Sequence, residues 1–179
     1  MSQGEQLKEE GMALFQRGSR SQAITKFEEA AQAFTAENDQ LGQAEALNNI
    51  GVIYRLQRNR EAATQALMQA QTIFAAIGDD NRQAQALGNL GDIYASQKKR
   101  EEAARAYSEA SALFAKSGDL AKQSQVLRAL SLLDLKRGRW FMAMMRMEES
   151  LRVNPRPTIL QRVFRRMLHF VLGMSGSST

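Results

Sequence analysis

Few residues of this 179-residue chain are of types that could carry out chemistry. The sequence contains no cysteine, which excludes a disulfide framework, thiol catalysis and a thiolate metal site. His169 is the only histidine, so a histidine-based metal site would lack partners, and we expect His169 to lie on a surface or an interface. Adjacent glutamates such as Glu101 and Glu102 lie about 100° apart on a helix and are typical of solvated faces. We therefore predict that the protein is not an enzyme and needs no cofactor or metal.

Asn49 and Asn89 are better candidates for a functional role, and that role would be binding. They occupy equivalent places in two similar segments of the chain. A carboxamide has both hydrogen-bond donors and acceptors, so it can bind a peptide backbone without requiring a particular side chain. The alternative is that both asparagines face solvent or cap helices.

A repeat of forty residues places these asparagines. Residues 44–54 recur as residues 84–94, and the match continues from Arg60 to Arg100 and from Phe74 to Phe114. The same frame extends towards both ends, and its fourth copy has Ser131 where the others have glycine and Asp134 where they have tyrosine. Terminal repeats are expected to be atypical because one of their faces lacks a neighbour.

Each repeat predicts two helices. Apolar and small residues recur at steps of three and four, from Leu47 to Tyr54 in the first helix and from Ala63 to Phe74 in the second. Polar breaks separate the helices, where glycine or asparagine can end one helix and aspartate can cap the next. We expect glycine in the first helix and alanine in the second to let the two helices approach closely, and the aromatic residues to fill the core between repeats. The residues concerned are Gly51, Gly91, Ala63 and Ala103, and the aromatic residues are Tyr54, Tyr94, Phe74 and Phe114.

At these residues the chain resembles the tetratricopeptide repeat (TPR) family. The small and large positions follow in the same order, although the period is forty residues where the common repeat has about 34. Longer variants occur in kinesin light chain-like proteins and in bacterial peptide-sensing regulators. The resemblance implies an all-α fold, a right-handed α-solenoid of four helix-turn-helix repeats with a C-terminal capping helix. The expected domain is 1–155, with repeats at about 4–37, 40–77, 80–117 and 120–155, followed by an amphipathic helix at 156–174 and a disordered tail at 175–179.

The resemblance also implies a function, because first helices of such repeats line a concave groove that binds peptides. We therefore expect a protein–protein interaction scaffold or adaptor that binds a peptide or protein segment. Carried over by position, the expected groove residues are Lys8, Met12, Glu45, Asn48, Asn49, Val52, Arg55, Gln85, Asn89, Asp92, Gln125 and Arg128. The carboxylate clamp of chaperone-binding members is not expected, because only two of its five positions match, at Lys8 and Asn49.

The C-terminal end of the chain suggests a second way of binding. From Lys136 onward the sequence has nine Lys or Arg and two Asp or Glu, which can attract an anionic lipid, a nucleic acid or an acidic partner. One alternative function is therefore a peripheral membrane- or nucleic-acid-associated protein acting through the basic helix, with nucleic acid the less favoured partner. We expect instead that this helix covers the last repeat, with Ile159, Val163, Phe164 and Met167 mostly buried.

The remaining expectations concern location and assembly. The segment 1–10 is polar, no run of about 18 apolar residues occurs, and there is no cysteine, a combination that indicates a cytoplasmic protein. Self-association stays open, because exposed end repeats can pair. The sequence does not identify the partner.

Overall fold

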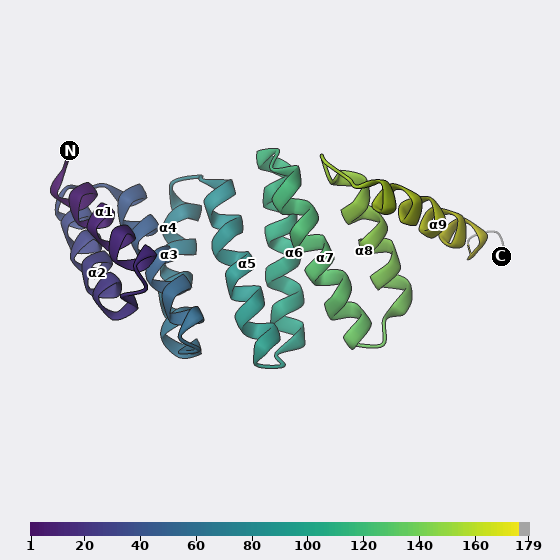
Figure 1. Ribbon diagram of the computed structural model, residues 1–179, viewed down its shortest axis with the longest axis horizontal. Helices are drawn as coiled ribbons and strands as arrows, with labels where there is room; N and C mark the ends of the chain where they lie inside the picture. Colours follow the sequence, from purple (N-terminus) through teal and green to yellow (C-terminus); the bar gives the residue numbers. More distant parts are fainter. Residues whose placement is uncertain (176–179) are drawn as a thin grey trace. The chain divides into compact units, whose positions relative to one another are not determined.

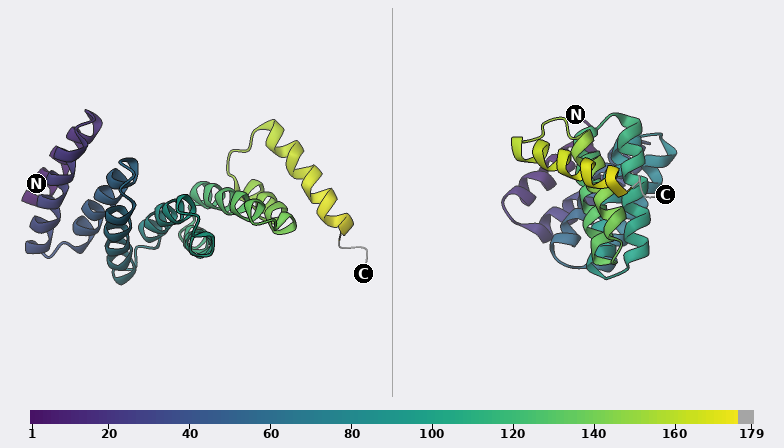
Figure 2. Two further views of the ribbon diagram at one scale, coloured as in Figure 1. Left: turned by 90° about the horizontal axis from the view of Figure 1, so that it is seen from below. Right: turned by 90° about the vertical axis from the view of Figure 1, so that its right-hand side faces the viewer.

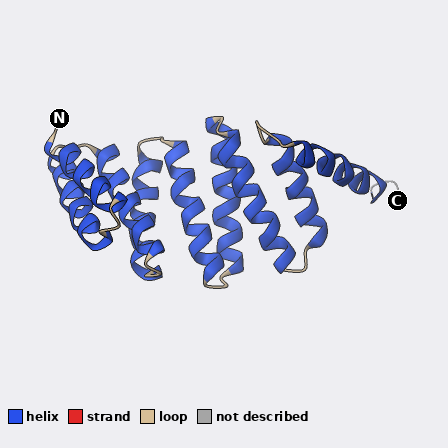
Figure 3. Cartoon of the chain, viewed as in Figure 1, coloured by secondary structure: helices blue, strands red, loops and turns tan. Residues whose placement is uncertain are grey.

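The computed structural model describes residues 1–175, and this part of the chain contains nine helices and no strand (Figures 1 and 3). The helices are α1 (Gln3–Gln16), α2 (Arg20–Ala36), α3 (Gln40–Leu56), α4 (Arg60–Ala76), α5 (Asp80–Ser96), α6 (Arg100–Ser117), α7 (Leu120–Lys136), α8 (Trp140–Val153) and α9 (Ile159–Ser175). Turns of two or three residues join the first eight helices, and residues 154–158 connect α8 to α9. The predicted all-α fold of repeated helix pairs is confirmed.

The chain divides into two compact units, and the boundary lies within α5, between Ile93 and Tyr94. In the first unit, α2 packs against α1 and α3, and α3 packs against α4. In the second unit, α7 packs against α6 and α8, and α8 packs against α9. In each unit, successive helices along the chain therefore pack against one another.

The turns between helices share one geometry. A residue with positive φ lies in the turn after each of the first seven helices, at intervals of twenty residues. These residues are Gly18, Asn38, Arg58, Gly78, Lys98, Gly118 and Gly138. The next backbone N–H then donates to the carbonyl five residues earlier, as from Asp39 to Phe34 at 2.8 Å. This is the hydrogen bond of the Schellman motif, which satisfies a carbonyl at the helix end. Asp39 also caps the following helix by accepting a hydrogen bond from the N–H of Gly42 at 2.9 Å.

The small residues at the helix crossings are confirmed as close-packed. A Cβ on Gly51 would lie 2.5 Å from Leu67 Cγ and 3.3 Å from the backbone oxygen of Ala63. Ala63 and Ala103 have no exposed surface. Phe74 and Phe114 are buried as predicted, whereas Tyr54 and Tyr94 are half-buried at the edge of their core clusters.

The fourth repeat replaces part of this apolar packing with polar contacts. The Ser131 hydroxyl donates a hydrogen bond to the backbone oxygen of Ala143 at 2.7 Å, across the contact of α7 and α8. Asp134 is 1% exposed, and its Oδ2 lies 3.0 Å from Nε of Arg146 in an ion pair. These two departures from the repeat pattern therefore hold α8 against α7 through specific polar partners.

The predicted burial of the C-terminal helix is wrong. Ile159 and Met167 are 78% and 59% exposed, and Val163 and Phe164 are also exposed. Leu168 is the one residue of α9 in the described set that is buried, at 8% exposure. Helix α9 lies beside one main neighbour, α8 (Figure 2). That contact covers only the strip of α9 that faces α8, so most of the wide apolar face stays exposed. Ser175 belongs to α9, and the rest of the expected disordered tail lies outside the described residues.

Candidate functional site

A groove of about 710 Å³ lies in the first unit, between three helices that begin their repeats. Its walls come from α1, α3 and the start of α5, with one aromatic residue from α4. The lining residues are Lys8, Glu9, Met12, Ala13, Gln16, Glu45, Asn48, Asn49, Phe74, Asn81, Arg82 and Gln85. Ligand sites in proteins are concave and have volumes of this order, so the groove is the candidate functional site.

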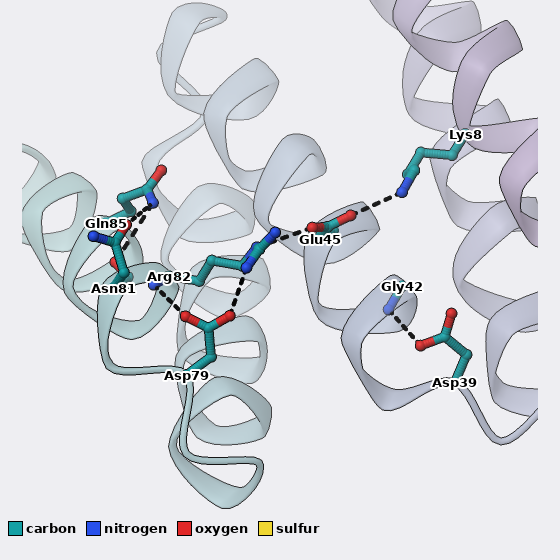
Figure 4. Close-up of polar contacts among 8 residues, drawn as sticks. All are labelled: Lys8, Asp39, Gly42, Glu45, Asp79, Asn81, Arg82 and Gln85. Atoms are coloured by element: carbon teal, nitrogen blue, oxygen red, sulfur yellow. Dashed lines mark hydrogen bonds and ion pairs between the residues drawn. The ribbon is translucent and has the colours of Figure 1, made fainter. Parts of the chain in front are cut away.

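Alternating charges connect the three helices across the groove. Lys8 Nζ on α1 lies 2.8 Å from Oε2 of Glu45 on α3 (Figure 4). The other oxygen of that carboxylate, Oε1, lies 2.9 Å from Nε of Arg82 on α5. Arg82 also pairs through Nη1 with Oδ2 of Asp79 at 2.6 Å. Both cations of the groove are therefore neutralised by carboxylates of the chain itself.

The pKa values of Asp79 and Arg82 reflect this pairing. Burial by itself would raise the pKa of Asp79, but hydrogen bonds from the backbone N–H and the guanidinium of Arg82 outweigh that effect and hold the pKa below its usual value. The same hydrogen bond to Asp79, together with the charge of Glu45, holds the pKa of Arg82 above its usual value. The pairing therefore favours the charged forms of Asp79 and Arg82.

The carboxamide side chains of the groove have fewer partners within the protein than its charged side chains do. Gln85 Nε2 donates to Oδ1 of Asn81 at 2.8 Å. The side chains of Asn48 and Asn49, both half-buried on α3, have no hydrogen-bond partner among residues 1–175. Asn48 Oδ1 is fully buried in that state. Buried polar atoms are normally hydrogen-bonded, so this acceptor is an exception, and the half-buried Asn48 side chain must turn towards the groove before Oδ1 can accept a hydrogen bond from a bound molecule.

The structure brings together six of the twelve residues predicted for the groove, and these are Lys8, Met12, Glu45, Asn48, Asn49 and Gln85. The other six lie elsewhere. Val52 and Arg55 lie further along α3, and Asn89 and Asp92 further along α5, where Arg55 Nη1 pairs with Asp92 Oδ2 at 3.1 Å. Gln125 and Arg128 belong to the second unit and line a pocket of about 200 Å³.

The sequence prediction missed Arg82 and its partner Asp79. A signal was present, because the ion pairs that join the first helices α1, α3 and α5 connect residues 37 apart. Lys8, Glu45 and Arg82 form such a series, as do Arg55 and Asp92. In a forty-residue repeat this spacing places the second residue one helical turn earlier in the next repeat, so opposite charges 37 apart predict contacts between first helices.

Neither a metal-ligating cluster nor a membrane-spanning helix occurs among the described residues. No group of three or more histidine, cysteine, aspartate or glutamate side chains within residues 1–175 could hold a metal ion. In the same part of the chain, no helix combines the length and the apolar character needed to cross a membrane. The chemistry that the groove can perform is hydrogen bonding through carboxamides beside a balanced set of charges.

Solved structures share this fold at low sequence identity. BtubC (BKLC) from P. vanneervenii matches with a TM-score of 0.75 and 20% identity, over 87% of this chain and 68% of that one. PilF of Pseudomonas aeruginosa matches with a TM-score of 0.69 and 21% identity, over 98% and 78%. MamA matches with a TM-score of 0.64 and 20% identity, over 85% and 78%. These likenesses concern the fold, and they confirm the resemblance to tetratricopeptide repeats.

A search of curated proteins found no significant match. The family model described as "Soluble NSF attachment protein, SNAP" matches residues 16–154, which cover the helices from the end of α1 to α8 and exclude α9. Since this match extends over more than half of the sequence, the chain belongs to the soluble NSF attachment protein (SNAP) family of helical-repeat proteins.

Proposed function

We propose that this protein is an interaction scaffold that binds an extended segment of a partner polypeptide in the groove of its first unit, mainly through the backbone of that segment. The observation that supports this is the contrast between paired charges and unpaired carboxamides. Lys8 and Arg82 are held by carboxylates, whereas Asn48 and Asn49 have no partner among the described residues. Recognition would then rest on hydrogen bonds rather than on charge.

A peptide backbone matches what the two asparagines offer. Each peptide unit has one N–H and one C=O, and each carboxamide can both accept and donate. An unpaired buried acceptor such as Asn48 Oδ1 costs about 1–3 kcal/mol, and a peptide N–H that meets it once the side chain turns towards the groove would remove that cost. A backbone ligand therefore gains from a group that the free protein leaves unsatisfied.

The walls of the groove favour tolerance of different side chains. Met12 and Ala13 supply apolar surface on α1, and methionine adapts to irregular shapes because its side chain is unbranched and flexible. The neutral charge balance gives no strong preference for an acidic or a basic ligand. A free C-terminal carboxylate is a poor ligand, because Lys8 already pairs with Glu45 and also lies 5.5 Å from the centre of the Phe34 ring.

The proposal can be tested with peptides selected from a random library on the full-length protein. The affinity of a selected peptide is then measured by calorimetry for the wild type and for Asn48→Ala/Asn49→Ala. Two lost hydrogen bonds predict a loss of affinity of about five- to 150-fold, since each contributes about 0.5–1.5 kcal/mol. Methylation of single backbone nitrogens of the peptide should weaken binding at the positions next to the asparagines.

Asn89→Ala is the matched control, because Asn89 is the equivalent asparagine of the next repeat and lies outside the groove lining. It should leave the affinity unchanged. Equal affinity of the wild type and the Asn48→Ala/Asn49→Ala variant would refute binding at this groove. A peptide whose affinity depends only on its side chains, and not on its backbone nitrogens, would refute recognition through the backbone.

A further inference from the structure

Helix α9 has a surface that the rest of the fold does not use. It lies beyond the region matched by the family model and packs against the rest of the second unit through α8. Its sequence is strongly amphipathic, because apolar residues recur at steps of three and four along one face. The exposed apolar residues are Ile159, Leu160, Val163, Phe164, Met167, Phe170 and Val171. A contiguous exposed apolar face of this kind marks an interaction site.

The opposite face of α9 is basic. Arg162, Arg165 and His169 are exposed and lie on the face away from the exposed apolar residues, and Arg166 is exposed at the border between the two faces. Arg156 precedes the helix, and from residue 150 to the end of the chain the sequence has five arginines and no aspartate or glutamate. The basic face of the helix is therefore not neutralised by acidic residues of its own segment.

We propose that α9 lies on the surface of a membrane that contains anionic lipids. The apolar face would enter the boundary between headgroups and acyl chains, and the arginines would remain at the level of the phosphates. An apolar face with a basic face opposite is the pattern of an interfacial helix. Helix α9 has 17 residues, and with three arginines it fits a position on the membrane rather than across it.

The charges favour this occupant over two others. A second copy of the chain could cover the apolar face, but it would leave the basic faces of both helices pointing away from the interface without an anionic partner. A nucleic acid would pair with the arginines but would leave the apolar side chains in water. An anionic lipid surface satisfies both faces of the helix together, and it acts independently of the groove in the first unit.

The test is co-sedimentation of the full-length protein with vesicles of phosphatidylcholine alone or with about one third phosphatidylserine. We expect binding to the anionic vesicles only. Val163→Glu/Met167→Glu should abolish it, and both side chains are exposed, so the variant should fold. Arg162→Gln/Arg165→Gln/Arg166→Gln should lower the partition coefficient by about 100-fold, since each arginine contributes about fivefold near an anionic surface.

Two matched controls remove general effects of charge and polarity. Met68→Glu places the same acidic residue on α4, at a side chain that is 51% exposed. Arg17→Gln/Arg20→Gln/Arg105→Gln lowers the net charge equally at exposed positions outside α9. Both controls should bind as the wild type does.

Several results would overturn the proposal. One is failure of the wild type to bind the anionic vesicles, and another is equal binding to both vesicle types. Loss of binding in the controls to the same extent as in the α9 variants would assign the effect to overall charge. A dimer in light scattering that Val163→Glu/Met167→Glu converts to a monomer, without vesicle binding by the wild type, would assign the face to self-association. Binding of duplex DNA or RNA in place of vesicles would assign it to nucleic acid.

Discussion

Replacement of Lys98 by glycine should stabilise the protein. Lys98 lies in the turn after α5 with φ of 62°, a conformation that residues with a Cβ adopt at a cost. The backbone holds it there, because the next N–H, of Lys99, donates to the carbonyl of Tyr94 at 2.9 Å. The Lys98 side chain is exposed, so its removal leaves no cavity in the core.

The expected gain follows from two opposing effects. The left-handed conformation costs a residue other than glycine about 1–2 kcal/mol. Glycine avoids this cost, but its greater conformational freedom in the unfolded chain offsets about 0.5–1 kcal/mol of the gain. The net gain is about 1 kcal/mol, which corresponds to an increase of about 2–4 °C in Tm for a chain of this size.

The assay is urea unfolding followed by circular dichroism, with Lys98→Ala as the reference. Alanine keeps the strained backbone but removes the charge near the end of α5, so the difference between the two variants isolates the effect of φ. Gly118→Ala is the reverse test. A Cβ at Gly118 would meet no atom within 4 Å, so its cost of about 1 kcal/mol comes from φ alone. Equal unfolding midpoints for Lys98→Gly and Lys98→Ala would refute the argument.

Three further changes test the core and the groove. Gly51→Ala should lower the free energy of unfolding by about 1 kcal/mol, because the clash with Leu67 outweighs the gain in helix propensity; a thermal melt equal to that of the wild type would place Gly51 outside a helix crossing. Arg146→Met should lower the free energy of unfolding by about 3 kcal/mol, because it leaves the buried Asp134 carboxylate unpaired. The double variant Asp134→Leu/Arg146→Met should recover most of that loss in denaturant unfolding. A double variant whose loss equals the sum of the two single losses would contradict this prediction. Asp79 has a lowered pKa in the folded state, so the stability that it contributes is present above its unfolded pKa of about 3.9 and is lost as the pH falls through the folded value. Asp79→Asn should therefore flatten the decrease in Tm between about pH 5 and pH 2. An unchanged decrease would exclude Asp79 as the source of this pH dependence.

Much of the fold could be predicted from the sequence because its determinants are local. The forty-residue period and the recurring small residues identify pairs of helices that cross closely, and Gly51 and Ala63 do meet in this way. The turns were predictable where Asn38, Gly78 and Gly118 supply residues that tolerate positive φ. Arg58 and Lys98 adopt the same conformation without such a signal, because the Schellman hydrogen bonds and the packing of the flanking helices impose it.

The groove was predicted only in part because its contacts depend on how successive first helices face one another. The assumption that every first helix lines one surface placed Asn49 and Asn89 together. The structure has Asn49 in the groove lining and Asn89 outside it. The link from Lys8 through Glu45 to Arg82 depends on the offset between helices, which the 37-residue spacing reflects and the repeat period alone does not.

The C-terminal helix shows a different kind of limit. Its apolar periodicity correctly predicted a helix, but periodicity does not say whether an apolar face is covered. Leu168 packs while Met167, one position earlier and about 100° around the helix, stays exposed, so the covered strip is narrow. Which strip is covered depends on the direction in which residues 154–158 leave α8, and that direction has no signature in the pattern of α9 itself.

Salt should distinguish the two binding surfaces, because their chemistry differs. The groove is close to neutral and its cations are already paired, so a peptide bound through Asn48 and Asn49 releases few counterions and its affinity should change less than about threefold between about 50 mM and 500 mM salt. Helix α9 has three exposed arginines without acidic partners in its own segment, so its affinity for anionic vesicles should fall by more than about tenfold over the same range. Peptide affinity can be measured by calorimetry and vesicle binding by co-sedimentation, on one preparation of the full-length protein. Peptide binding as sensitive to salt as vesicle binding would show that the paired charges of the groove open to receive the ligand, and recognition there would then be electrostatic rather than directed at the backbone.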